Sequence, residues 1–237
     1  MSTQVLWQGS LVPIEDDKSW SGQPFAIPIP NATLRDTSSI SDLGPFLAIG
    51  EAWADLVTHF SPEAPFILDV GCGCGKLARF LHINPKLRYI GIDLFLPSIE
   101  WCRKAFEPIT GARFRFEHFN GYSESYNPTG DVDPATYQFP PETNSVDTVV
   151  CASLFTHLNE PACTHYLNEI ARVLKSGGRA ILSIHTQPAA GAVFSGTEAR
   201  IDIEPNYFVK LALAAGLSFF QSPGVVYGQS TLVFEKH

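Results

Sequence analysis

The chain has 237 residues, 45% of them hydrophobic, which is enough for one well-buried domain and short for two. The formal net charge is −8 and there is no block of Lys and Arg, so we expect neither a nucleic acid nor an anionic membrane as partner, because phosphate groups are bound by clustered cations. No apolar run approaches membrane-spanning length and no basic segment with an apolar core follows Met1, so we expect a cytoplasmic protein with a small-molecule substrate.

Residues 1–40 are rich in Pro, Ser and Asp, and three prolines disfavour regular structure between Gly22 and Asn31. We expect this segment to be an arm or lid rather than a domain. Residues 41–237 then form the single domain.

Apolar residues recur at helical spacing from Phe46 to Phe60. A start signal at Ser41–Pro45 and a stop at Ser61 bound this pattern and predict a helix. Such a helix could cover a bound ligand or simply pack on a sheet, and the sequence favours neither.

A strand, a glycine turn and a helix are predicted next. The apolar run Phe66–Val70 is typical of a buried parallel strand, and apolar residues return at helical spacing from Leu77 to Leu81. Between them Gly71, Gly73 and Gly75 allow left-handed backbone and let a ligand approach without meeting a Cβ atom. The free N–H groups of the following helix would face that ligand, as in a nucleotide cradle.

The residues around this turn argue against a phosphate ligand. Lys76 stands where a dinucleotide fingerprint needs Gly or Ala, and Leu77 where a phosphate loop needs Ser or Thr. Asp69, two residues before the first glycine, would repel a pyrophosphate and suit a sulfonium or an amine. Cys72 and Cys74 are too close together and too isolated for a zinc site, and five cysteines make no disulfide framework, so we expect no metal.

A second strand is predicted at Leu87–Asp93, followed by a helix that begins at Pro97. Asp93 lies 18 positions after Gly75. A carboxylate at the end of the second strand accepts hydrogen bonds from ribose hydroxyls in adenosine cofactors generally, so Asp93 does not distinguish among them. The alternative is a helix cap or a loop acid.

The third predicted strand, Ala112–His118, leads to Asn120 and Gly121 and then to a long loop, Tyr122–Asn144, with scattered aromatic residues. Long loops without secondary structure tend to be functional, so we interpret this one as a lid or a substrate wall. A surface excursion is the alternative.

The remaining elements complete an alternating pattern of strands and helices. The predictions are a strand at 145–152 with an exit at 153–158, a helix from Pro161, a turn at 175–178, a strand at 179–185, a loop at 187–203, a helix from Pro205, and two strands at 217–221 and 230–234.

The first motif of class I S-adenosylmethionine-dependent methyltransferases is an apolar strand followed by Asp-x-Gly-x-Gly-x-Gly, which Asp69 and the three glycines match in full. Glu169–Arg179 also resembles that family, with Ser176 where proline is commoner. The resemblance extends from about Phe46 to the C-terminus. It implies an α/β fold with a seven-stranded, mostly parallel, doubly wound sheet and a C-terminal antiparallel hairpin. A weaker likeness to a bacterial subgroup, often associated with sugar or secondary-metabolite pathways, rests on residues 100–102, 114–118, 126–130 and 153–158.

The resemblance implies S-adenosyl-L-methionine as cofactor. In the family an acid at the end of the third strand usually meets the adenine amino group; here Asn120 stands there, and its amide can both accept and donate. A simple turn residue in Asn-Gly is the alternative. The residues expected to bind the cofactor are Asp69, Gly71, Cys72, Gly73, Gly75, Asp93, Leu94, Asn120, Gly121, Ser153 and Leu154.

Three histidines, His118, His157 and His185, follow strands, at the edge where ligands bind in open parallel sheets. His157 follows the strand expected beside the transferable methyl and is our first candidate for the catalytic base, with His185 second. A helix-entry histidine bonded to the backbone, or three histidines that hold a metal, are the alternatives.

We therefore predict methyl transfer to an oxygen, rather than nitrogen or carbon, of a small molecule such as a natural product or sugar. The competing hypothesis is a protein of the same fold that binds S-adenosylmethionine for cyclisation or cofactor sensing. A homodimer is compatible with either.

Overall fold

The computed structural model describes residues 3–17, 27–37 and 40–237. Its centre is a seven-stranded sheet in the order β10-β11-β7-β6-β3-β4-β5, in which the five strands from β7 to β5 are parallel and β11 runs antiparallel to both of its neighbours. This confirms the predicted α/β fold. The strands are β3 (Phe66–Val70), β4 (Arg88–Asp93), β5 (Phe114–His118), β6 (Val146–Cys151), β7 (Leu174–Ile184), β10 (Leu217–Val226) and β11 (Gln229–Lys236).

Helices cover both faces of this sheet because successive strand residues point to opposite sides. Ile67 joins one core with the helices α2, α3 and α4, whereas Leu68 joins a second core with α5 and α6. Asn159 accepts from Ala162 N and Glu204 accepts from Asn206 N and Tyr207 N, which caps α5 and α6. The helices are α2 (Leu43–Phe60), α3 (Ala78–Leu81), α4 (Leu96–Thr110), α5 (Glu160–Val173) and α6 (Pro205–Ala214).

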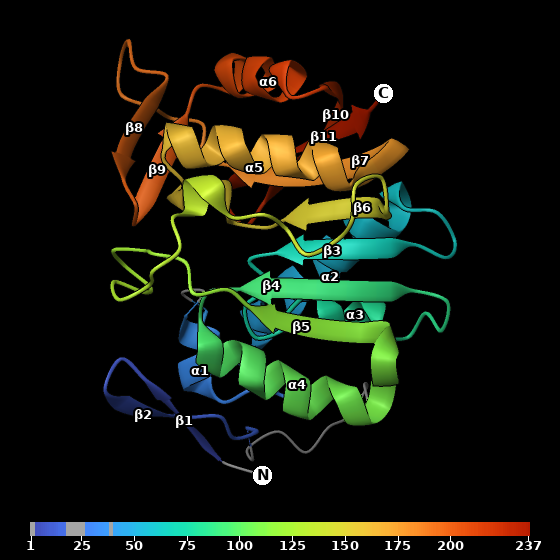
Figure 1. Ribbon diagram of the computed structural model, residues 1–237, viewed down its shortest axis with the longest axis vertical. Coiled ribbons are helices and arrows are strands. Elements are labelled where there is room, and N and C mark those ends of the chain that lie inside the picture. Colours follow the sequence, from blue (N-terminus) through green and yellow to red (C-terminus); the bar gives the residue numbers. More distant parts are fainter. Residues whose placement is uncertain (1–2, 18–26, 38–39) are drawn as a thin grey trace.

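The strand order reverses at β3, which pairs with β4 on one side and with β6 on the other. Ligands of open α/β sheets bind outside the carboxyl ends of the strands at such a point. In Figure 1 these ends point to the left, and the hairpin β1–β2, the loop after β5 and the hairpin β8–β9 lie on the same side. Three separate parts of the chain therefore surround the expected ligand edge.

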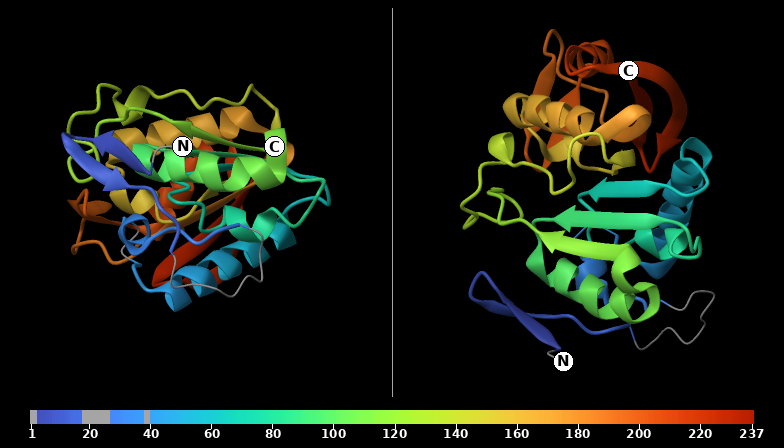
Figure 2. Two further views of the ribbon diagram at one scale, coloured as in Figure 1. Left: turned by 90° about the horizontal axis from the view of Figure 1, so that it is seen from below. Right: turned by 45° about the vertical axis from the view of Figure 1, so that its right-hand side comes forward.

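The N-terminal arm contains more regular structure than the sequence indicated. Residues Gln4–Trp7 (β1) and Ser10–Pro13 (β2) form a hairpin, and α1 spans Ala32–Asp36. Of the segment where prolines disfavour regular structure, residues 22–26 lie outside the described part, and 27–31 make only an isolated bridge between Pro30 and Asp16. Figure 2 shows the hairpin beside the core of the domain.

The prediction of a loop at 187–203 is wrong in part. Residues Phe194–Thr197 (β8) and Arg200–Ile203 (β9) form a hairpin, whose second strand buries Ile201 and Ile203. Four residues with a Gly inside the first strand give too short an alternation to be recognised, and burial against the rest of the domain stabilises the pair. The loop Tyr122–Asn144 contains, by contrast, only isolated β-bridges and the short helix η2 at Pro134–Thr136.

Two other features bear on function. The helix after the glycine turn, α3, is a single turn of four residues, shorter than the cradle pattern suggested. In the described ranges no helix combines the length and apolar character needed to cross a membrane.

Candidate functional site

The glycine turn after β3 is held against the end of β4 by hydrogen bonds. Gly71 N and Cys72 N donate to Ile92 O at 2.9 and 3.1 Å, and Gly73 N donates to Asp93 Oδ2 at 2.8 Å. The other oxygen of Asp93 accepts from Phe95 N at 2.8 Å. The carboxylate of Asp93 therefore holds both the glycine turn and the exit of β4. Asp93 is also one of the residues predicted to bind the cofactor.

The glycines in this turn have different roles. Gly73 has φ +52°, and a Cβ atom there would meet nothing within 4 Å, so this part of the turn has open space in front of it. A Cβ atom on Gly75 would lie 2.8 Å from the ring of Phe106, so this glycine allows α4 to pack closely. The open position is the one that a ligand can approach.

Two acids lie at the turn, Asp69, which is buried, and Asp93, which is partly buried. Asp69 is 2% exposed and accepts from the hydroxyl of Tyr89 at 2.6 Å. Burial, with a smaller contribution from the charge of Asp93, raises the pKa of Asp69 to about 7, although the Tyr89 hydroxyl and Lys76 act in the opposite direction. Burial also raises the pKa of Asp93, against the backbone N–H groups of Phe95, Gly73 and Leu94, which lower it. Because like charges disfavour ionisation, a cationic ligand would relieve this acid pair.

The cysteines around the turn are packing residues. The Sγ atoms of Cys72 and Cys102 each lie 3.6 Å from Gly73 O, and burial raises the pKa of both thiols and of Cys74. Thiols that stay protonated in an apolar layer are unreactive. Within the described ranges no three His, Cys, Asp or Glu side chains converge as a metal site would require.

Asn120 is tied into the loop that follows β5. Its amide donates to Asp131 Oδ1 at 2.8 Å and accepts from Asn127 Nδ2 at 3.0 Å, and Asn127 also donates to Gly121 O at 2.9 Å. The amide nitrogen and oxygen of Asn120 each have capacity for one more bond. Contact with an adenine amine therefore stays a prediction.

His118 contacts a different part of the chain from the other two candidate histidines. Its Nε2 atom lies 3.1 Å from Leu94 O, and its ring lies edge-on to Trp7 with centroids 5.8 Å apart. Trp7 also packs edge-on to Phe95 at 5.6 Å. The N-terminal hairpin thus lies over the exit of β4, next to Leu94.

Ser153 and Leu154 lie on the other side of the glycine turn. Ser153 has φ +62°, uncommon for a residue with a side chain, and its N–H donates to Ser183 Oγ at 2.8 Å. The Leu154 side chain covers Gly71, since a Cβ atom there would be 3.5 Å from Leu154 Cδ1. Leu154 therefore borders the turn, and a role of Ser153 and Leu154 in cofactor binding stays a prediction.

His157 and His185 approach each other at the carboxyl ends of β6 and β7. His157 Nδ1 lies 2.7 Å from Glu198 O. Because a carbonyl only accepts, Nδ1 carries the proton and Nε2 of the neutral ring is the free acceptor. Burial lowers the pKa of His185, and the charges of Arg200 and His157 lower it further, against that of Asp202. The structure thus brings the two predicted bases within electrostatic reach.

One residue that joins the loops around His157 was not predicted. The carboxylate of Glu198, in the turn of β8–β9, accepts from Ser123 Oγ, from Glu124 N at 2.8 Å and from Ser125 N at 3.4 Å. Tyr126 follows in this loop and packs edge-on to His157 with centroids 5.5 Å apart. The aromatic content of the loop and the weaker likeness over residues 126–130 had pointed to Tyr126.

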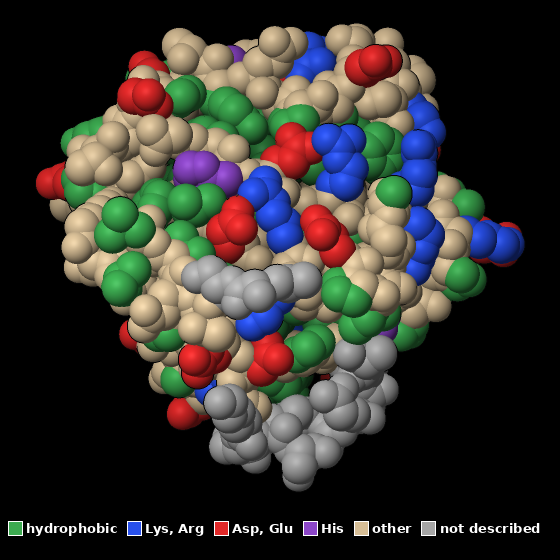
Figure 3. Space-filling model, turned by 60° about the horizontal axis from the view of Figure 1, so that its bottom comes forward, with side chains coloured by type: hydrophobic (Ala, Val, Ile, Leu, Met, Phe, Trp, Pro, Cys, Tyr) green, Lys and Arg blue, Asp and Glu red, His purple; other side chains and the backbone are tan. Residues whose placement is uncertain are grey.

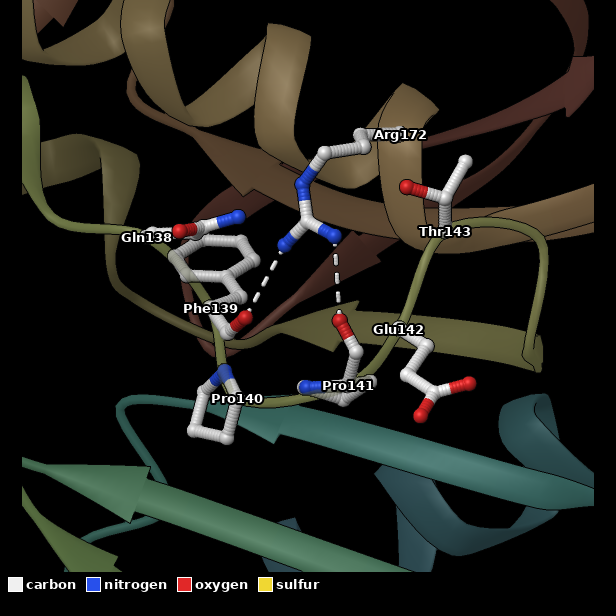
Figure 4. A pocket seen from close by; sticks show the side chains of 7 residues that line it. All are labelled: Gln138, Phe139, Pro140, Pro141, Glu142, Thr143 and Arg172. Atoms are coloured by element: carbon white, nitrogen blue, oxygen red, sulfur yellow. Dashed lines mark hydrogen bonds between the residues drawn. The ribbon is translucent and has the colours of Figure 1, made fainter.

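A hollow of about 510 Å³ lies elsewhere, where residues 138–143 approach the amino end of β6 (Figure 4). Arg172 donates to Phe139 O at 2.9 Å and to Pro141 O at 3.1 Å, and pairs with Glu169. This guanidinium therefore anchors the chain entering β6. The hollow is remote from the glycine turn and carries no chemistry of the site.

Comparisons with known proteins agree with this architecture. Residues 67–178 match the family model of a methyltransferase domain. A TehB-like S-adenosylmethionine-dependent methyltransferase from Corynebacterium glutamicum is similar, at 20% identity over 86% of this chain and 93% of that chain, with a TM-score of 0.58. A 1,6-didemethyltoxoflavin-N1-methyltransferase from Burkholderia thailandensis is 20% identical over 86% of this chain and 84% of that chain, with a TM-score of 0.59. The [4+2]-cyclase SpnF is 18% identical over 78% of this chain and 81% of that chain, with a TM-score of 0.61. Residues 67–178 therefore belong to the methyltransferase domain family, on a chain that has the class I methyltransferase fold.

Proposed function

We propose that this protein binds S-adenosylmethionine at the glycine turn and transfers its methyl group to an oxygen of a small molecule. The observation that carries the proposal is the open glycine turn beside two carboxylates, the buried Asp69 and the partly buried Asp93. A pyrophosphate would be repelled there, whereas a ligand with a sulfonium and an amine is attracted.

The residues of the turn fit an adenosine cofactor. Each oxygen of Asp93 accepts one backbone N–H and keeps a lone pair for a ribose hydroxyl. Leu154 covers Gly71 with apolar surface, and Leu94 follows Asp93 directly in the chain. When bound, S-adenosylmethionine supplies an activated methyl group for in-line displacement. The Burkholderia neighbour, described with bound S-adenosylhomocysteine, supports this choice of cofactor.

The chain's own groups would handle the proton of the acceptor. The bond from Nδ1–H of His157 to a carbonyl favours the neutral tautomer whose acceptor is Nε2, and in that form Nε2 can remove a hydroxyl proton as the acceptor attacks. A base of this kind is useful only where a proton must leave, which favours an oxygen acceptor over nitrogen or carbon. The arm before Ser41, the loop 122–144 and the segment 187–203 would enclose the acceptor.

The kind of acceptor is argued from charge and from the wall of the site. Acidic side chains lie among the basic ones on the face in Figure 3, and the formal net charge is −8, which supports a small molecule over a nucleic acid. Tyr126 can contact a ring-shaped or apolar acceptor such as a natural product or a sugar.

Binding and turnover test the proposal separately. Calorimetry should show S-adenosylhomocysteine binding more tightly than NADH, and the reverse order would refute the cofactor. Incubation with methyl-labelled S-adenosylmethionine and a metabolite library should give a labelled product. The neighbour SpnF is described as a [4+2]-cyclase, so a role in cyclisation is the second candidate. Tight binding of S-adenosylhomocysteine without any label transfer would favour that candidate.

A further inference from the structure

Glu198 is the point at which three parts of the chain are joined beside His157. Its carbonyl accepts from His157 Nδ1 at 2.7 Å, and its carboxylate accepts from Ser123 Oγ and from the N–H groups of Glu124 and Ser125. The contacts to His157 and Ser123 span 41 and 75 positions of the chain. This turn therefore couples the exit of β6 to the loop after β5.

The carboxylate sets the conformation of the turn that carries Tyr126. Ser123 Oγ donates to Glu198 and in turn accepts from Tyr126 N at 2.9 Å, so a chain of hydrogen bonds runs from Glu198 to Tyr126. The Tyr126 ring then packs edge-on to His157. Gln8, at the tip of the N-terminal hairpin, donates to Tyr126 O and to Asn127 Oδ1, both at 3.3 Å. The imidazole is thus held by its Nδ1 bond on one side and by the Tyr126 ring on another.

Glu198 is not a second base. Both of its carboxylate oxygens already accept donors from the Ser123–Ser125 segment, and that arrangement satisfies a charge that would otherwise be costly to remove from water. Its contribution is the orientation of other groups.

We propose that Glu198 is a positioning residue that keeps His157 as the Nδ1–H tautomer, with Nε2 directed to the acceptor, and that keeps Tyr126 as a wall of the acceptor site. The proposal rests on the proposed function for its catalytic consequence. Its structural part stands independently, because tautomer and loop protection can be measured in the protein without substrate.

Glu198→Ala tests this directly, since it removes the carboxylate and leaves the backbone carbonyl in place. The amides of Glu124 and Ser125 should exchange with solvent about tenfold faster or more, as expected when charge-assisted hydrogen bonds are lost. The ¹⁵N shifts of His157 should change from a single Nδ1–H tautomer to a mixture. Turnover should fall about 10- to 100-fold, with an unchanged dissociation constant for S-adenosylhomocysteine.

Controls separate positioning from a general loss of stability. Glu198→Gln keeps one acceptor oxygen and the side-chain size, so it should show smaller changes of the same kind. Glu107→Gln removes an equal charge from an exposed position of α4, outside the segments that enclose the acceptor, and should alter none of these quantities. Unchanged exchange and an unchanged His157 tautomer in Glu198→Ala would overturn the proposal. If the tautomer shifts but no methyl transfer is found in any variant, the proposed function fails and the positioning of His157 stands.

Discussion

Asp69 should make the protein without bound cofactor less stable as the pH rises, and replacing Asp69 with asparagine should remove this decline. In the folded chain burial raises its pKa from 3.8 to about 7, so the folded state holds a proton that the unfolded state has released. Stability from this group is fully present below pH 3.8 and is lost as the pH rises towards 7, above which the effect is constant. The difference between the two pKa values corresponds to about 4 kcal/mol of unfolding free energy.

Asp69→Asn removes the titration but keeps an oxygen that can accept from the Tyr89 hydroxyl at the same position. At pH 7.5 the variant should therefore be more stable than the parent by up to about 4 kcal/mol, and it should lack the parent's decline between pH 4 and 7. Urea denaturation of both proteins across this range measures the difference. Affinity for S-adenosylmethionine should fall in the same variant, because the carboxylate that attracts a cation is gone.

The matched control is Asp55→Asn, which removes the same charge from an exposed position of α2 and should change stability by no more than about 0.5 kcal/mol. A variant at Asp69 that is less stable than the parent at pH 7.5 would refute the reasoning. That result would mean that Asp69 is a stabilised anion, with Tyr89 as its essential donor.

Three further outcomes test the rest of the site. Asp93→Ala should cost about 1.5–3 kcal/mol of cofactor affinity in calorimetry, partly because Gly73 N and Phe95 N lose their acceptor, and an unchanged affinity would remove Asp93 from the site. His157→Ala should lower turnover by about 10²–10⁴ and leave cofactor affinity nearly intact, whereas a stable and fully active variant would transfer the role to His185. Deleting residues 1–13 should reduce turnover, since Gln8 and Trp7 then no longer cover the loop and the exit of β4; full turnover would contradict a lid.

The part of the fold around the glycine turn was predictable because its signals are local. Phe66–Val70 is apolar except for Asp69, since both faces of a central parallel strand are buried, and the structure begins and ends β3 at the predicted residues. Helix α2 ends at Phe60, just before the predicted stop at Ser61. Asp93 ends β4 because polar groups occur where a buried strand reaches solvent.

Hydrogen-bond partners that lie on neighbouring strands could not be predicted from the sequence. The hydroxyl that bonds Asp69 comes from Tyr89 on β4, and the register that pairs Asp69 with Gly91 is a property of the assembled sheet. The two hairpins were missed for a related reason. β1–β2 and β8–β9 are four-residue strands, whose stability depends on contacts with the domain rather than on their own propensity.

The match to a known family consequently covers more of the cofactor side of the site than of its acceptor side. The match to the methyltransferase domain ends at residue 178, so it includes the glycine turn, Asp93 and His157 but neither His185 nor Glu198. Gln8 reaches Tyr126 across 118 positions, and Glu198 reaches Ser123 across 75, so the acceptor side is built by contacts between distant segments. Substitutions in such contacts can change which molecule is accepted without altering the cofactor motif. A search for the acceptor should therefore be guided by Tyr126, His157 and the two hairpins rather than by the glycine turn.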